Sequence, residues 1–188
     1  MQKIIELYKT ALNGLSHASG LGPLFLRVFL VFPFYMAGST KLGGIEGTAA
    51  WFEHSLELPF PLAMAYLAAI TEYLGAILLA IGLATRFIAI PLIITMLVAA
   101  LTAHWDNGWY AIAQSSDPEV SKRLNAARSI LQEHGNYDWL TAKGSFVILN
   151  NGIEFAVTYL VMLISLFFTG GGKYFSVDYW IGRKFLNR

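Results

Sequence analysis

One stretch limits what this chain can fold into more than any other: residues 61–83, PLAMAYLAAITEYLGAILLAIGL. It is long and apolar enough to cross a bilayer, because a hydrocarbon core needs roughly 20 such residues in a helix. An acid, Glu72, nevertheless stands near its centre. A central acid costs roughly 2.5 to 3.5 kcal/mol on insertion scales. We therefore expect a membrane-spanning helix that turns Glu72 toward protein.

The composition places the whole chain in the same class. The 188 residues are 56% hydrophobic and 13% charged, and the mean hydropathy is +0.54. These values are typical of a multi-span membrane protein, and one domain over residues 1–188 accounts for the length. The chain has no cysteine, which excludes dithiol redox chemistry and thiolate metal sites. We expect no nucleic-acid partner.

Three further apolar segments predict spans at residues 21–37, 87–103 and 145–168. Backbone in lipid must satisfy its own hydrogen bonds, so each should be helical. The fold prediction is therefore an all-α, polytopic membrane protein, a four-helix transmembrane bundle with amphipathic surface helices.

Two other spans also carry a charge, Arg27 in the first and Glu154 in the last. Because unpaired buried charges are costly, we expect one polar cluster in which Arg27 and Glu72 approach directly or through one water. In a helical fourth span, Asn150, Asn151 and Thr158 would share the inward face of Glu154. Such residues either hold helices together or mark a proton, ion or ligand path, and the sequence leaves both open.

The remaining segments are predicted to lie at the membrane surface. Residues 1–19 have the spacing of an amphipathic helix. Residues 38–44 form a glycine-containing link with Lys41, and residues 45–60 an acidic, aromatic-rich loop. Asp117 before Pro118, with Gly135 as a stop, predicts a second surface helix over residues 117–134.

The distribution of cations predicts the orientation of the four spans. The side of the termini would hold seven cations: Lys3, Lys9, Arg86, Lys173, Arg183, Lys184 and Arg188. The opposite side would hold five, Lys41, Lys122, Arg123, Arg128 and Lys143, three of them far from the membrane in a long loop. The positive-inside rule then places both termini in the cytoplasm.

The densest chemical stretch is HWDNGW at residues 104–109. His104, Asp106, Trp105 and Trp109 could bind a metal, stack on a ring or move protons. Equally, Asp106 and its neighbours are turn formers and the tryptophans are interfacial anchors. On the first interpretation, we expect one cavity, open toward the outer leaflet or periplasm, lined by Lys41, Glu72, His104, Asp106 and Glu154.

Several motifs together resemble the DoxX family of small four-helix membrane proteins. They are AGSTKL at 37–42, TEYLGAILLAIGLATR at 71–86, TMLVAALTAHWDNGW at 95–109 and the closing GGGKYFSVD. Within the family, HWDNGW with the inserted segment before NNGIE resembles the HvfX branch, found beside biosynthetic enzymes for copper-binding modified peptides. The resemblance implies a bacterial inner-membrane protein in a family associated with quinone-linked oxidation, notably as the small subunit of thiosulfate:quinone oxidoreductase.

The leading functional expectation is a quinone-interacting, electron-transfer accessory protein, because a lipid quinone is already dissolved in the bilayer. Glu72, His104 and Glu154 are the predicted catalytic residues. The predicted cofactor-binding residues are Arg27, Lys41, Trp105, Asp106, Trp109 and Asn151. A second redox partner, in the membrane or periplasm, would be needed, and a homo-oligomer is left open.

The rival expectation is non-enzymatic: copper handling, or a membrane dock for peptide-modifying partners. It would use acidic and histidine side chains of the outer loops, namely Glu46, Glu53, His54, Glu57, His104 and Asp106.

Overall fold

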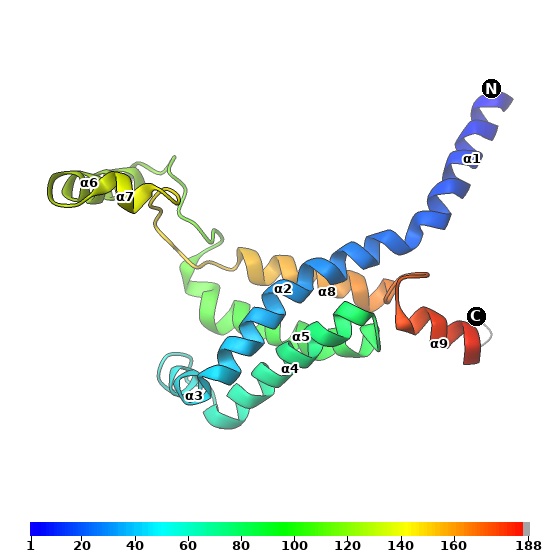
Figure 1. The fold of residues 1–188 in the computed structure, drawn as a ribbon, viewed down its shortest axis with the longest axis horizontal. Helices are drawn as coiled ribbons and strands as arrows, with labels where there is room; N and C mark the ends of the chain where they lie inside the picture. The colour runs from blue at the N-terminus through cyan, green and yellow to red at the C-terminus, as the bar shows by residue number, and fades with distance from the viewer. Residues whose placement is uncertain (186–188) are drawn as a thin grey trace. The chain divides into compact units, whose positions relative to one another are not determined.

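The computed structural model describes residues 1–185, and for Gln2, Ala11 and Leu15 it describes the backbone alone. Arg188, one of the cations counted for orientation, lies outside the described residues. The chain divides into two compact units. The first holds residues 1–97 and the C-terminal part from Tyr159, and the second is Val98–Thr158. Figure 1 shows a structure built of helices.

The helices follow the chain in a simple order. They are α1 (Gln2–His17), the 3-10 turn η1 (Ala18–Gly20), α2 (Leu21–Gly43), α3 (Ile45–His54), α4 (Pro61–Ile81), α5 (Thr85–Val98), the π-helical turn η2 (Ala99–His104), the 3-10 turn η3 (Trp105–Asn107), α6 (Pro118–His134), α7 (Tyr137–Thr141), α8 (Glu154–Thr169) and α9 (Val177–Phe185).

Three helical stretches of the described chain are long and apolar enough to cross a membrane: Ala18–Gly43, Pro61–Ile81 and Thr85–Asn107. Glu154–Thr169 is a shorter apolar helix. The protein is therefore an all-α, multi-pass membrane protein with three candidate spans. The expected spans at residues 21–37 and 87–103 fall within these stretches, and the expected span at residues 61–83 extends two residues past Ile81.

The core of the first unit begins with the packing of α2 against α4. The buried residues of α4 recur every three or four positions and are mostly small: Ala65, Ala69, Glu72, Gly75, Ala76 and Leu79. Small residues let membrane helices approach closely. Gly38 of α2 lies so near α4 that an added Cβ would stand 2.5 Å from the Tyr73 nitrogen. One apolar cluster then joins α2 and α4 to Leu92 and Met96 of α5 and to Leu163 and Leu166 of α8.

Two expectations for the segment between α2 and α4 are wrong. The helix α2 does not end near residue 37 but continues to Gly43, so Lys41 lies in its last turn and not in a link. Residues 45–60 do not form only a loop, because α3 occupies Ile45–His54. Ala49 and Phe52 of α3 are buried with Ala65 of α4, and this apolar contact stabilises the short helix.

The second unit contains the connection between α5 and α8. Asp117 caps α6 as the sequence predicts, since its Oδ1 accepts from the amides of Glu119 and Val120. Residues 145–153, expected to begin the fourth span, are not helical, and α8 starts only at Glu154. The reason is an alternative backbone pairing: Ala113 N donates to Ile148 O, and Ile153 N donates to Gly108 O.

Candidate functional site

An ion pair between two membrane helices is the most distinctive polar contact of the first unit. Lys41 Nζ donates to Glu72 Oε2 at 2.6 Å. The Lys41 side chain is 22% exposed and that of Glu72 is 4% exposed. Both residues lie inside candidate spans. The expectation that Glu72 faces protein is confirmed, and Lys41 offsets the cost of burying its charge.

The two helices that carry the ion pair also carry two packed aromatic rings and a buried hydroxyl. The rings of Tyr35 and Tyr73 pack with centroids 5.3 Å apart. Ser39 Oγ is buried and has no hydrogen-bond partner among the described residues. Ser39 and Lys41 follow Gly38 within one turn of α2. Gly38 is the residue at which the backbone of α2 closely approaches Tyr73. The two helices therefore carry an unpaired hydroxyl and two packed aromatic rings in addition to the ammonium and the buried carboxyl group of the ion pair.

Arg27 is fully buried but does not pair with Glu72. Its guanidinium donates to Leu79 O at 2.9 Å, Ala80 O at 3.4 Å and Phe175 O at 2.7 Å. Leu79 lies seven residues after Glu72, about 10 Å along the helix axis at 1.5 Å per residue. The expected contact between Arg27 and Glu72 is therefore wrong. Arg27 instead satisfies carbonyls at the C-terminal end of α4, where a cation also interacts favourably with the helix dipole.

The C-terminal segment completes the surroundings of Arg27. The Asp178 carboxylate accepts from Ala84 N at 2.6 Å and Thr85 N at 2.8 Å, so it caps the first turn of α5. Sequence reasoning missed Asp178. The available signal was Ser176 at the start of an amphipathic segment, and Ser176 Oγ does accept from Tyr179 N. We assign Arg27 and Asp178 to structure, because their partners are mostly backbone groups.

His104 and Asn151 meet in the second unit. His104 Nδ1 lies 2.8 Å from Asn151 O, and Asn107 Nδ2 donates to the same oxygen at 3.3 Å. A carbonyl oxygen only accepts, so Nδ1 of His104 is the donor, and Nε2 of a neutral imidazole keeps its lone pair. Asn151 adopts the left-handed conformation, with φ 59°, which asparagine tolerates better than most residues.

Glu154 forms hydrogen bonds with backbone groups that lie close to it in space. Its Oε2 accepts from Ala111 N at 3.0 Å, and its own N donates to Trp109 O at 2.9 Å. Thr158 Oγ1 donates to Glu154 O at 2.7 Å. Because Asn150 and Asn151 precede α8, the expected polar ladder on one helix face is wrong. These contacts favour a structural role for Glu154 over a role in a proton path.

The other candidate residues of the second unit are open to solvent. Trp105, Asp106 and Trp109 are all exposed. Within residues 1–185, no three His, Asp or Glu side chains gather as metal ligands would. The cavity expected from Lys41, Glu72, His104, Asp106 and Glu154 draws on both units and stays a prediction.

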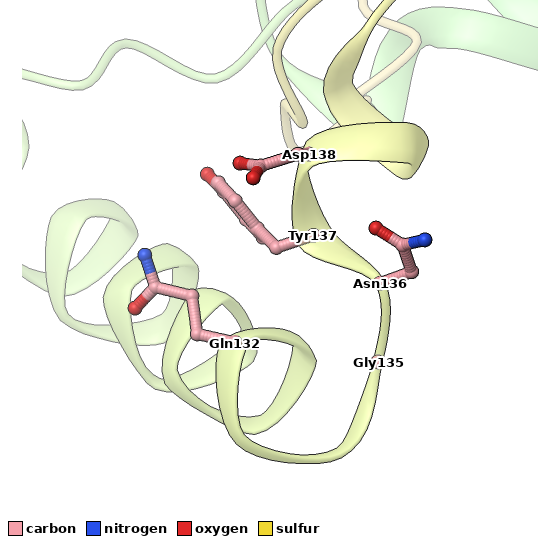
Figure 2. A pocket seen from close by; sticks show the side chains of 5 residues that line it. All are labelled: Gln132, Gly135, Asn136, Tyr137 and Asp138. Atoms are coloured by element: carbon pink, nitrogen blue, oxygen red, sulfur yellow. The ribbon is translucent and has the colours of Figure 1, made fainter.

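A surface depression in the second unit lies where α6 meets α7. Gln132, Gly135, Asn136, Tyr137 and Asp138 line it, and Figure 2 shows Gln132 extending from the last part of α6. None of the residues predicted from the sequence to bind or react lies there. Asn136 is used locally, since its Oδ1 accepts from Trp139 N. We assign no site to this depression.

Residues 22–105 match the sequence model of the DoxX family. We call residues 22–105 the DoxX region because of this similarity. The DoxX region covers α2 to α5 and includes Arg27, Lys41, Glu72 and His104, whereas Asn151 and Glu154 lie outside it. The Lys41–Glu72 ion pair is therefore made entirely within the DoxX region.

Two curated proteins are similar to the chain. "Putative oxidoreductase CatD" of Bacillus subtilis (strain 168) is 35% identical over 82 residues, which cover 44% of this chain and 59% of that protein. "Inner membrane protein YphA" of Escherichia coli (strain K12) is 34% identical over 85 residues, 44% of this chain and 60% of that protein. The chain thus spans about three fifths of the length of these relatives. No solved structure matches it at a significant level.

Proposed function

We propose that this DoxX-type protein is an inner-membrane, quinone-interacting accessory protein of electron transfer, and that the quinone head group binds at Lys41 and Glu72. The observation that carries the proposal is the 2.6 Å ion pair inside two candidate spans. Intramembrane ionisable residues commonly mark sites of function. The name of CatD as an oxidoreductase and that of YphA as an inner-membrane protein support the class and the location.

The chemistry of the pair suits a quinone carbonyl. Lys41 Nζ, partly exposed, can turn from Glu72 to donate to one carbonyl oxygen, and the unpaired Ser39 hydroxyl is a further donor on the same helix. The Tyr35 and Tyr73 rings offer an apolar surface for the quinoid ring. A quinone carbonyl oxygen requires hydrogen-bond donors. The residues fit a quinone because Ser39 has a hydroxyl without a partner and Lys41 has an ammonium that can exchange partners.

Reduction of a quinone to a quinol takes two electrons and two protons. A separate redox subunit or soluble electron donor must supply the electrons, because this chain has no cysteine and no residue pattern for a bound redox group is evident. The part left to the chain is to orient the head group and carry protons. Glu72 can hold one proton at its carboxyl group when Lys41 turns to the carbonyl, and pass it to one reduced oxygen, whereas the second proton comes from water.

The proposal includes a topology of four spans with both termini cytoplasmic. The helix α8 has 16 residues, about 24 Å at 1.5 Å per residue, which is somewhat short of a hydrocarbon core of about 30 Å. Its residues Leu163 and Leu166 nevertheless share the apolar cluster with α2, α4 and α5. The excess of cations beside the termini supports the orientation.

The alternative is copper handling or docking for peptide-modifying enzymes, as the resemblance to the HvfX branch implies. A copper site would need several donors close together. No three His, Asp or Glu side chains gather within residues 1–185, so no observation singles out a set of copper ligands. We therefore place this alternative second.

Titration of the purified protein with a short-chain ubiquinone in detergent tests the proposal. We expect saturable binding that weakens at least about tenfold in Lys41→Met, because a lost hydrogen bond to a charged donor is worth about 1.5–3 kcal/mol. Lys143→Met, a change in the second unit, is the matched control and should bind like the wild type. Equal affinity in the wild type and Lys41→Met would contradict the proposal, and stoichiometric copper binding without quinone binding would favour the alternative.

A further inference from the structure

The helix α1 presents an apolar face that its own unit does not cover. Ile4, Ile5, Tyr8 and Leu12 recur at helical spacing, and each is at least 45% exposed. Lys3 and Lys9 lie on the remaining surface of the helix and are also exposed. A helix with one apolar face and a cationic polar face is typical of chains that lie in the membrane interface.

The helix α9, at the other end of the chain, has the same character. Trp180, Ile181 and Phe185 are exposed, whereas Arg183 and Lys184 supply charge. The Arg183 guanidinium lies 5.7 Å from the centre of the Trp180 ring, and Lys184 Nζ lies 5.3 Å from that of Phe185. Aromatic rings beside cations are the residues expected at the level of lipid head groups.

The two helices are attached to the same end of the first unit. Gly20, at the junction of α1 and α2, lies so close to Lys173 that an added Cβ would stand 2.9 Å from the Lys173 nitrogen. Arg27 near the start of α2 donates to Phe175 O, just before α9. In Figure 1, α1 and α9 accordingly leave this unit at the same end.

The end of the first unit that carries α1 and α9 has a strongly positive charge. Lys3, Lys9, Lys173, Arg183 and Lys184 are all exposed, against the acids Glu6 and Asp178. Asp178 already binds two amides of α5 through its two oxygens. The net charge of the surface therefore matches an anionic partner, and its apolar faces match the acyl boundary of a bilayer.

We propose that α1, Lys173 and α9 form one terminal collar that binds anionic lipid head groups at the membrane surface. The apolar faces of both helices enter the interface, and the five cations contact lipid phosphates. This collar is independent of the quinone proposal. It joins the two ends of the chain into one lipid-binding surface at the end of the bundle opposite to Lys41.

Site-directed spin labelling tests the collar directly, since the chain has no native cysteine. Single variants Ile4→Cys and Ile181→Cys report the apolar faces, and Glu6→Cys and Gly182→Cys are their polar-face controls. In nanodiscs of phosphatidylcholine with phosphatidylglycerol, we expect labels at the first two positions to be several-fold more accessible to oxygen than to a water-soluble nickel reagent, and the controls to show the reverse. Equal aqueous exposure of all four labels would overturn the proposal.

The charge requirement needs a second comparison. In the wild-type background, the labels should be better protected from the nickel reagent in nanodiscs with phosphatidylglycerol than in nanodiscs without it. Replacing Lys3, Lys9, Arg183 and Lys184 together by Gln should abolish this difference in protection. Replacing Lys122 and Arg123 of α6 by Gln is the matched control and should leave that difference unchanged. Protection that is the same in neutral and anionic discs, or that rises with the number of protein copies per disc, would contradict the collar, the latter result indicating contact with a second copy.

Discussion

Lys41 shows how a single residue can be misplaced by local sequence patterns. The run Gly38-Ser39-Thr40, followed by two glycines at 43 and 44, reads as the end of a helix, because these residues favour turns. Gly38 instead serves helix packing, since it allows the close approach of α2 to Tyr73. The sequence therefore predicted that Glu72 faces protein, but it could not identify Lys41 as the partner.

The ion pair predicts coupled effects of its two residues on stability. Glu72→Gln and Lys41→Met should each destabilise the protein, because the first leaves the partly buried Lys41 and the second the buried Glu72 without its partner. The double variant should lose less than the sum of the two, with a coupling of about 1–3 kcal/mol. Unfolding of the four proteins in detergent measures the cycle. Strictly additive losses would show that the two side chains do not interact.

The hydrogen bond made by His104 Nδ1 can be tested by substitution. His104→Asn keeps an amide donor near the position of Nδ1, so it should preserve the bond to Asn151 O and most of the stability. His104→Leu removes the donor and should cost about 1 kcal/mol, a typical value for one hydrogen bond. Thermal unfolding of the two variants provides the comparison. If both variants lose the same stability, the bond at 2.8 Å contributes nothing.

At the scale of elements, the boundaries of α8 and α9 depend on contacts distant in sequence. Residues 145–153 are apolar enough to continue a span, but their backbone pairs with residues 108–113, which hydropathy cannot reveal. Three glycines follow α8 at residues 170–172. Gly171 is buried. A Cβ atom added at Gly171 would lie 2.7 Å from Ser176 Cβ and 2.8 Å from Thr85 Oγ1, so only glycine fits there without a shift of its neighbours.

This packing predicts that Gly171→Ala destabilises the protein by about 1–3 kcal/mol, the usual cost of overpacking. Gly182→Ala is the matched control. No described atom lies within 4 Å of a Cβ added at Gly182, and alanine favours the helix more than glycine does. Denaturation of both variants in the same detergent measures the difference. A loss in Gly182→Ala as large as that in Gly171→Ala would argue against the tight fit.

At the scale of the whole molecule, hydropathy was enough to place the three long spans, because each is a continuous apolar run in one helix. The pairing of charges was not predictable in the same way. Arg27 and Glu72 share the buried stripe between α2 and α4, but pairing depends on their height along the helices, which only the packed structure gives. The helix α6 was predictable because its cap is local.

The proposed topology predicts which positions share a side of the membrane. Single cysteines at Lys9 and Arg183 should react with an impermeant maleimide only from the cytoplasmic side. Cysteines at Glu53 and Ser129 should react only from the opposite side, since α2 and α8 each cross the bilayer in this proposal. Labelling of intact cells and of inverted vesicles makes the comparison. Labelling of Arg183→Cys and Ser129→Cys from the same side would exclude α8 as a span.

The quinone carried by the protein itself tests the central claim most directly. The wild type, Lys41→Met, Glu72→Gln and the control Lys143→Met are purified from membranes in mild detergent, and extracted quinone is quantified per protein. We predict close to one quinone per wild-type or Lys143→Met chain, and a loss of most of it in the two site variants, with all four proteins folded. Equal quinone in all four preparations, or none in the wild type, would contradict a quinone site at Lys41 and Glu72.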